Sequence, residues 1–158
     1  MNAVIDRLED FFLAKEVRYE MISHGPSYSA QRTAQAEHVP GREEIKVVMV
    51  KADGRNVMVV LPATHQVDFL KLKSVLDAGD LRLAEESEFA SLFPDCEVGA
   101  MPPFGSLYSV PVYADRLLAE DDHIVFNGGT HREAFMISYR DYEKLEHPQV
   151  ADFARRAH

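Results

Sequence analysis

The sequence has few of the residues that could tie a small protein together covalently or through a metal. Among its 158 residues there is one cysteine, Cys96, so no disulfide can form within the chain and a reducing compartment is expected. None of its seven histidines has another three or four residues away, the spacing of a helical metal pair, and we predict no metal site. A hydrophobic share of 46% still suffices for one core, so residues 1–158 are expected to form a single domain.

Several sequence signatures of catalysis and of membrane insertion are also missing. There is no Gly-x-Ser-x-Gly, Walker loop, Gly-x-Gly-x-x-Gly, His-Glu-x-x-His or Cys-x-x-Cys, so we expect no cofactor. Cys96 stands between Asp95 and Glu97, carboxylates that would raise the pKa of its thiol and keep it unreactive. The longest apolar runs, such as 57–61, are far too short to span a bilayer, and the first residues do not resemble a secretory signal. We therefore expect a cytoplasmic protein with no membrane partner.

Basic residues are scarce, with 17 Lys and Arg against 26 Asp and Glu, which gives a net charge of −9. Binding to phosphates depends on Lys and Arg, so this balance argues against a protein that coats nucleic acid. Only between Arg32 and Arg82 do basic residues slightly outnumber acidic ones. A polyanion would have to bind that part of the chain, and the overall field would not attract it.

Hydrophobic periodicity and turn residues predict helices interspersed with strands. Val4, Leu8, Phe11 and Phe12 recur at the spacing of one helix face. The predicted helices cover 2–15, a short segment after Ser27 or Ser29, 65–76 after a Thr64 cap, 86–92, and a last helix that Ser138 and Asp141 begin. The predicted strands cover 17–22, 45–52, 56–63, 107–112, 123–126 and 134–137. The predicted fold class is α/β, with a mixed, partly curled sheet and surrounding helices.

The clearest local signal is Asp53-Gly54 between two β-branched apolar runs. Glycine accepts positive φ without a Cβ clash, so this dipeptide predicts a tight hairpin turn. The second run is apolar at every position from Val57 to Leu61, which is typical of a strand buried on both faces.

Lys46 is the first candidate functional residue, because it lies at the start of an otherwise apolar strand. Strand alternation places its side chain on the face of Val48 and Val50. If that face is covered, Lys46 is a cation in a cleft that needs an anionic partner. The alternative is an edge lysine that extends to water.

Two glycine-rich segments supply the other candidates. In Gly99-Ala100-Met101-Pro102-Pro103-Phe104-Gly105 the prolines stiffen the chain and the glycines leave its backbone open to a ligand carbonyl, although an ordinary turn has the same composition. Asn127-Gly128-Gly129-Thr130-His131 joins two apolar strands through glycines that let a ligand or another chain come close. His131 could position a water or bind a hydroxyl, or it could simply be solvated.

In order along the chain, these segments resemble the YbaK family, which includes the editing domain inserted in bacterial prolyl-tRNA synthetases. The resemblance extends from about His24 to Leu145. It rests on the His24-x-Pro26 loop with Ser29, the Lys46 strand, the Asp53-Gly54 hairpin, the loop from Gly99 to Gly105, and Gly128-Gly129 with His131.

The resemblance implies hydrolysis of the ester that joins a small non-cognate amino acid to the 3′ end of a tRNA, usually proline tRNA. It implies that Lys46 binds the terminal phosphate or adenosine, that the Gly99 loop binds the aminoacyl carbonyl or ribose, and that His131 lies near the amino-acid pocket. We assign Lys46, Gly99 and His131 to catalysis. Residues expected to contact the substrate are His24, Ser29, Met101, Pro103, Phe104, Gly128 and Gly129. Expected partners are the tRNA 3′ end and, because of the acidic charge, a prolyl-tRNA synthetase or elongation factor that presents it.

Two other functions fit the same residues. One is a binding module that kept the pocket for an aminoacyl or nucleotide ligand and lost catalysis. The other is a small-molecule esterase that has no connection with tRNA.

Overall fold

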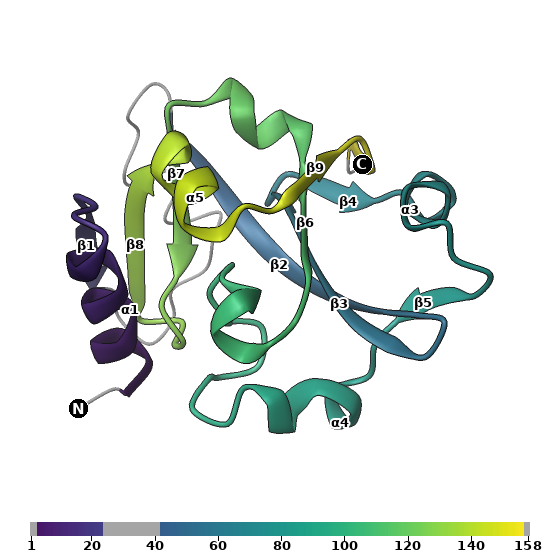
Figure 1. Ribbon diagram of the computed structural model, residues 1–158, viewed down its shortest axis with the longest axis horizontal. Helices are drawn as coiled ribbons and strands as arrows, with labels where there is room; N and C mark the ends of the chain where they lie inside the picture. Colours follow the sequence, from purple (N-terminus) through teal and green to yellow (C-terminus); the bar gives the residue numbers. More distant parts are fainter. Residues whose placement is uncertain (1–2, 24–41, 157–158) are drawn as a thin grey trace.

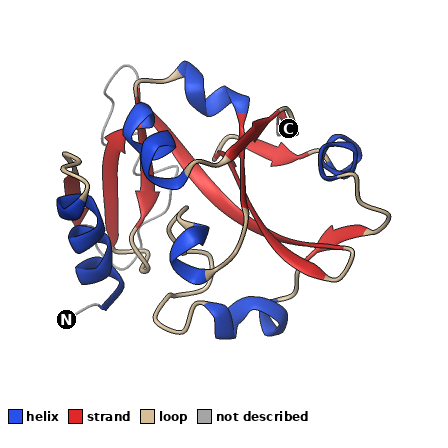
Figure 2. Cartoon of the chain, in the orientation of Figure 1, coloured by secondary structure: helices blue, strands red, loops and turns tan. Residues whose placement is uncertain are grey.

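The computed structural model describes residues 3–23 and 42–156. Its helices are α1 (Ala3–Ala14), α3 (Phe69–Leu76), α4 (Glu86–Phe89) and α5 (Tyr139–Glu146), with 3₁₀ turns η1 (Ala90–Leu92), η2 (Gly105–Tyr108) and η3 (Arg116–Glu120). Its strands are β1 (Glu20–Ser23), β2 (Arg42–Ala52), β3 (Arg55–Pro62), β4 (His65–Val67), β5 (Leu81–Leu83), β6 (Val112–Asp115), β7 (His123–Asn127), β8 (Glu133–Ser138), β9 (Gln149–Ala151) and β10 (Ala154–Arg156). The helices surround the strands (Figures 1 and 2).

The strands form one mixed sheet of eight, in the order β1-β8-β7-β2-β3-β6-β9, with β5 beside β2 and a separate pair β10-β4. The pairs β2–β7, β3–β6 and β6–β9 are parallel, whereas β1–β8, β7–β8, β2–β3 and β2–β5 are antiparallel. The predicted α/β class with a mixed sheet is confirmed.

Strand β2 connects the two halves of the sheet. Its first residues pair with β7 and its last with β5, while β3 follows it along most of its length (Figure 1). The predicted hairpin is present, with Ala52 opposite Arg55 and both turn residues at positive φ, 50° for Asp53 and 82° for Gly54. These are the dihedral signs of a type I′ turn, which matches the twist of the strands it joins.

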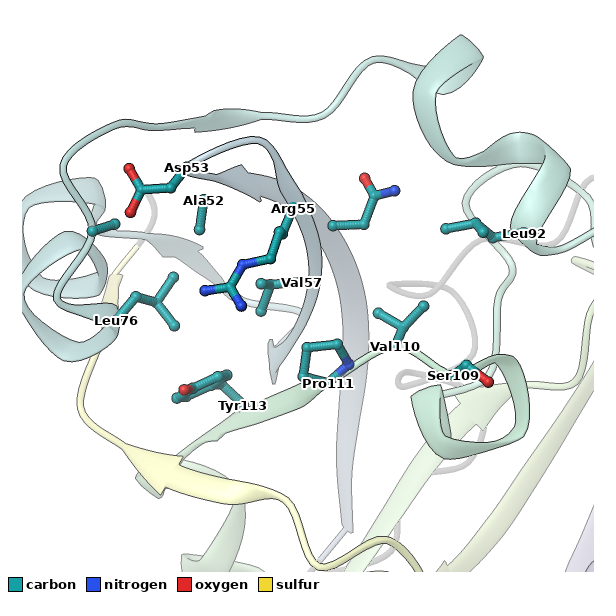
Figure 3. A pocket seen from close by; sticks show the side chains of 12 residues that line it. Ala52, Asp53, Arg55, Val57, Leu76, Leu92, Ser109, Val110, Pro111 and Tyr113 are labelled. Atoms are coloured by element: carbon teal, nitrogen blue, oxygen red, sulfur yellow. The ribbon is translucent and has the colours of Figure 1, made fainter.

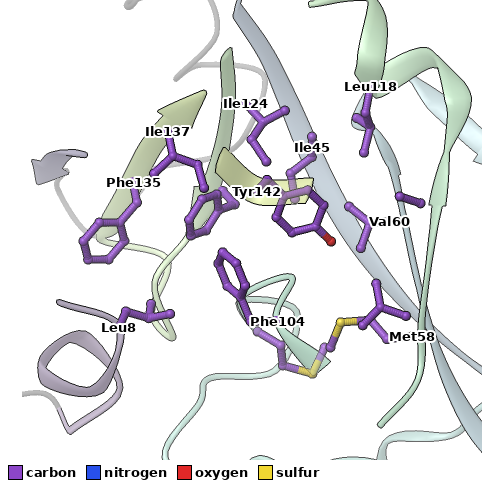
Figure 4. Close-up of a cluster of buried hydrophobic side chains, with 14 of the residues drawn as sticks. Leu8, Ile45, Met58, Val60, Phe104, Leu118, Ile124, Phe135, Ile137 and Tyr142 are labelled. Carbon is purple, nitrogen blue, oxygen red and sulfur yellow. The ribbon is translucent and has the colours of Figure 1, made fainter. Parts of the chain in front are cut away.

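Alternation along β2 and β3 separates two hydrophobic clusters, one on each face of the sheet. The first cluster contains Ile45, Met49, Met58 and Val60, together with α1 and the aromatic side chains around Phe104 (Figure 4). The second contains Val50, Val57, Val59 and Leu61 with Leu72 of α3 and Phe153. Strand β3 contributes to both, so the prediction that it is buried on both faces is confirmed.

Helix α1 confirms its predicted amphipathic pattern, because Val4, Leu8 and Phe12 are buried against β7 and β8 (Figure 1). The Ser138 cap is also confirmed, since its Oγ accepts a hydrogen bond from Asp141 N at 3.0 Å. No helix within residues 3–23 or 42–156 is long and apolar enough to cross a membrane.

Two predicted elements are wrong. The helix predicted from 65 starts at Phe69, because residues 65–67 pair with β10 and Asp68, in place of Thr64, caps the helix through Leu70 N and Lys71 N. The strand predicted over 107–112 is largely the 3₁₀ turn η2, and the strand itself starts at Val112.

Candidate active site

The Gly99 segment is joined by main-chain hydrogen bonds to the turn between β7 and β8. Glu97 N donates to Gly129 O at 2.7 Å, and Gly129 N donates to Ala100 O at 2.9 Å. The Glu97 carboxylate also accepts a hydrogen bond from His131 N at 2.7 Å. The structure therefore brings together two of the segments singled out in the sequence, although about 30 residues of chain separate them.

The His131 imidazole lies directly against this segment, and its surroundings fix its tautomer. Its Nε2 lies 2.9 Å from Val98 O. A carbonyl oxygen only accepts hydrogen bonds, so Nε2 carries the proton and, in the neutral ring, Nδ1 is left as an acceptor. Gly99 faces the same ring, because a Cβ added at Gly99 would lie 3.6 Å from His131 Cε1.

Residues Glu97 to Ala100 form a tight turn that leaves main-chain donors available. Ala100 N donates to Glu97 O at 3.0 Å, and Gly99 has φ of +82°, which glycine adopts without strain. Within the described part of the chain, the N–H groups of Val98 and Gly99 donate to no acceptor. Both residues are exposed, so a ligand can reach these N–H groups.

The second half of the loop is anchored in the core. Phe104 is fully buried, and its ring meets those of Phe12, Phe126 and Tyr142 at centroid distances of 5.8, 5.4 and 5.3 Å. Met101 is buried in the same cluster. These two side chains were predicted to form the walls of a pocket, and in the structure they pack in the hydrophobic core and anchor the loop to it.

Helix α5 fixes the same part of the loop through polar contacts. Tyr142 Oη donates to Pro103 O at 2.9 Å, and burial raises the Tyr142 pKa, so the hydroxyl remains a donor. The Glu146 carboxylate accepts from Ser106 N at 3.0 Å and from Ser106 Oγ at 2.7 Å. Burial raises the Glu146 pKa, partly offset by these two hydrogen bonds.

Gly128 and Gly129 were expected to let a ligand or another chain come close, and in the structure the groups close to them are side chains of this protein. A Cβ at Gly128 would lie 2.5 Å from the Phe135 ring, and one at Gly129 would lie 2.8 Å from Val4. Gly129 also has φ of +95°. These glycines let α1 and β8 pack against the turn that carries His131.

Lys46 is partly buried on the face of β2 opposite the first cluster, as alternation predicted. It pairs in register with Leu61, which belongs to the second cluster. Burial lowers the pKa of its ammonium group. Within residues 3–23 and 42–156, no carboxylate forms an ion pair with Lys46.

The strand register relates Lys46 to the turn that follows β7. Glu44 pairs with Val125 in the parallel β2–β7 ladder, and two residues farther along each strand lie Lys46 and Asn127. Because Ile124 and Phe126 belong to the first cluster, alternation places Asn127 on the Lys46 face. Asn127 Oδ1 is buried and has no hydrogen-bond partner among the described residues. Sequence reasoning did not select Asn127, and its position as the last strand residue before Gly128 is the signal that could have found it.

The remaining predictions from the sequence concern His24 and Ser29, a metal site, and Cys96. His24 and Ser29 lie outside the described residues. Within the described ranges no group of three or more His, Cys, Asp or Glu could hold a metal ion. Cys96 is half-buried, and its thiol pKa is raised mainly by burial and partly by Asp95. The site therefore offers a lysine, main-chain donors and an imidazole.

Comparison with known proteins identifies the family of the chain. Residues 24–145 match the model of the aminoacyl-tRNA editing domain. The chain belongs to this family. The multifunctional Ser/Thr-tRNA deacylase ProXp-y of Escherichia coli K12 is 33% identical over 114 residues, which cover 70% of this chain and 68% of that protein. The proline–tRNA ligase of Bacillus cytotoxicus is 36% identical over 93 residues, which cover 58% of this chain but only 16% of the ligase.

Solved structures agree on the fold of the editing-domain family. A crystal structure described as a trans-editing enzyme for prolyl-tRNA synthetase superposes with a TM-score of 0.83, covering 98% of this chain and 99% of the other, at 20% identity. At this identity the likeness concerns the fold alone. The predicted resemblance to the YbaK and prolyl-tRNA synthetase editing domains is confirmed.

Proposed function

We propose that this protein is an aminoacyl-tRNA deacylase that removes a small non-cognate amino acid from mischarged tRNA. The observation that carries the proposal is the Glu97–Ala100 turn, beside the His131 imidazole, whose exposed N–H groups have no partner among residues 3–23 and 42–156, in a chain of the editing-domain family. Such N–H groups stabilise the oxyanion that develops when an ester is hydrolysed.

In the proposed reaction a water oxygen attacks the aminoacyl carbonyl carbon, and the ester bond to the terminal ribose then breaks. The carbonyl oxygen accepts hydrogen bonds from Val98 N and Gly99 N, and the ribose oxygen leaves with a proton. His131 Nδ1 orients the water, because Nε2 is engaged by Val98 O. Lys46 binds a phosphate near the tRNA 3′ end. The products are the free amino acid and the tRNA.

The proposed substrate is proline tRNA that carries a small amino acid. Synthetase pockets discriminate poorly between small side chains, since one methylene contributes only about 1–3 kcal/mol, so such tRNAs need a second, hydrolytic check. The relative in Escherichia coli is named for seryl and threonyl esters, which adds serine and threonine to the candidates. The net charge of −9 favours presentation of the tRNA by a prolyl-tRNA synthetase or an elongation factor.

The first test is a deacylation assay on proline tRNA charged separately with alanine, cysteine, serine, threonine and proline. We expect rapid loss of at least one non-cognate amino acid, with prolyl-tRNA spared. If correctly folded protein accelerates none of these reactions, the proposal is wrong for proline tRNA and the non-catalytic binding module becomes the better interpretation.

The second test is a pair of lysine variants on β2. Lys46→Ala should greatly reduce deacylation without unfolding the protein, because it removes a ligand contact and little core volume. Lys51→Ala, at the other end of the same strand, loses a 3.3 Å contact to Gly54 O and an electrostatic attraction to Glu88, and should retain activity. Unfolding of Lys46→Ala at room temperature would show that Lys46 is structural.

The third test separates His131 from the turn that it contacts. His131→Gln retains an amide donor for Val98 O but lacks the imidazole nitrogen that would orient water. We expect kcat to fall by about 10²–10⁴-fold, the range for loss of a general acid–base group, with a smaller change in KM. An unchanged kcat would remove His131 from the mechanism.

A further inference from the structure

A cavity lies beside the turn of the β2–β3 hairpin, and none of the residues assigned to deacylation lines it. Its volume is about 500 Å³, within the range of small-molecule sites. The hairpin, the end of α3, and the segment from Ser109 to Tyr113 form its walls (Figure 3).

Strand alternation and register explain why these side chains meet. Arg55 and Val57 lie on one face of β3, and Tyr113 of β6 pairs with Val59 on that same face. Leu76, at the end of α3, closes one side, and Pro111 closes the other. In Figure 3 the Arg55 side chain extends over Val57, and its guanidinium points between Leu76 and Tyr113.

The Arg55 guanidinium is the positive group of this cavity. Within the described ranges it forms no ion pair, whereas Arg82 is paired with Glu88 at 2.7 Å. A guanidinium over an apolar wall can bind the phosphate or carboxylate of a ligand through two parallel hydrogen bonds.

The same hairpin also places an ionised acceptor near Arg55. The Asp53 carboxylate accepts from Asp80 N at 2.8 Å and from Gly79 N at 3.0 Å, and these hydrogen bonds lower its pKa, so it is ionised at neutral pH. Asn56 also lines the cavity, and its Nδ2 donates a long hydrogen bond of 3.4 Å to Glu88 O.

We propose that this cavity binds a nucleoside monophosphate, either as a free nucleotide or as one nucleotide of an RNA chain. Arg55 binds the phosphate, and the base packs against Tyr113 and Pro111. A single phosphate is specified because Arg55 is the one cation among the described residues that line the cavity, and the nearby Asp53 carboxylate, whose pKa the Arg55 charge helps to lower, repels additional negative charge. Aromatic contact with a base needs no particular sequence, so any of the four bases can bind.

The test is calorimetric titration of the protein with AMP, CMP, GMP and UMP, and with adenosine as the ligand without phosphate. We expect saturable binding of all four nucleotides. Adenosine should bind at least about tenfold more weakly than AMP, the change expected when a charge-assisted contact is lost. Amide NMR shifts on AMP binding should concentrate at Val57, Leu76 and Tyr113 and leave Gly99 and His131 unchanged.

Two matched variants locate the phosphate. Arg55→Gln should weaken AMP binding about tenfold or more, whereas Arg140→Gln, an exposed arginine on α5, should bind AMP like the wild type. No saturable binding of any nucleotide, equal affinity of Arg55→Gln and wild type, or NMR shifts centred on Gly99 and His131 would each overturn the proposal.

Competition with uncharged tRNA distinguishes the two sources of the nucleotide. If tRNA displaces AMP and Arg55→Gln raises the KM for mischarged tRNA, the cavity binds a nucleotide of the substrate. If tRNA does not compete, it binds a free nucleotide. The AMP titrations, the NMR shifts and the competition with tRNA do not depend on deacylation, so their failure leaves the proposed editing function standing. Failure of the deacylation assay likewise leaves the nucleotide site standing.

Discussion

The Tyr142 hydroxyl offers the sharpest test of how the Gly99 loop is fixed. Tyr142→Phe removes one oxygen and leaves the ring, so the aromatic contact with Phe104 at 5.3 Å remains. What is lost is the 2.9 Å hydrogen bond to Pro103 O, between α5 and the second half of the loop. The change therefore isolates one polar contact without creating a large cavity.

The size of the effect follows from burial. Tyr142 and Pro103 are both buried, so water cannot replace the missing donor. Leaving a buried acceptor without its partner costs about 1–3 kcal/mol. A domain of this size loses roughly 2–4 °C in Tm per kcal/mol, so we expect a decrease of about 4–8 °C for a loss near 2 kcal/mol. We also expect a lower kcat, because the loop that presents Gly99 N loses one of its anchors.

Tyr139→Phe is the matched control. Tyr139 is also a buried tyrosine of α5, but its hydroxyl donates to Glu143 Oε2 at 3.1 Å, within the helix. Glu143 is exposed and keeps water as a partner, so the loss of stability should stay below about 1 kcal/mol. Deacylation should be unchanged in this variant.

The measurements are thermal unfolding by circular dichroism and single-turnover deacylation of the substrate identified in the first assay. Equal Tm values and equal kcat values for the two variants would refute the reasoning. A Tm decrease confined to Tyr142→Phe with an unchanged kcat would show that the bond stabilises the fold without positioning the loop.

Three further predictions concern stability. Asp115→Ala removes the acceptor for Phe153 N at 2.9 Å, Ala154 N at 2.8 Å and Leu117 N at 3.0 Å, and should lower the free energy of unfolding in urea by about 3–5 kcal/mol; a loss under 1 kcal/mol would contradict it. Gly128→Ala places a Cβ 2.5 Å from a buried ring and should cost about 1–3 kcal/mol, whereas Gly54→Ala has nothing within 4 Å and should show only the cost of positive φ. Burial raises the pKa of Glu146 in the folded state. The stability that Glu146 contributes is therefore fully present below its ordinary pKa of 4.5 and is lost as the pH rises through the raised pKa. Glu146→Gln should flatten that part of the curve of Tm against pH, and parallel curves for the variant and the wild type would contradict this prediction.

The sequence correctly predicted those elements of the fold that depend only on residues near them in the chain. Asp53-Gly54 adopts the two positive φ values that its hairpin requires, and Ser138 caps α5 through its own side chain. The choice between Thr64 and Asp68 as a helix cap could not be made locally, since either residue can cap a helix. It depends on β10, about 90 residues later in the chain, which pairs with residues 65–67.

The same distinction applies to the site. Lys46 was selected because a cation at the start of an otherwise apolar run is conspicuous, and its partial burial is consistent with alternation. The link between Glu97 and Gly129, and the tautomer of His131, depend on two loops that meet only in the folded chain. The roles of Met101 and Phe104 could not be read from the sequence for the same reason, since a hydrophobic loop residue can line a pocket or support it from the core.

The way in which the Gly99 loop is held explains why so few side chains carry the proposed chemistry. Main-chain N–H groups stabilise an oxyanion only if their direction is fixed before the substrate arrives. Here the β7–β8 turn fixes one end of the loop through Glu97 and Gly129, and α5 fixes the other through Tyr142 and Glu146. Residues far from the ester thus set the geometry of donors that have no side chain of their own. Variants of Tyr142 and Glu146 should consequently change kcat more than KM, whereas variants of Lys46, which binds the tRNA end, should change both.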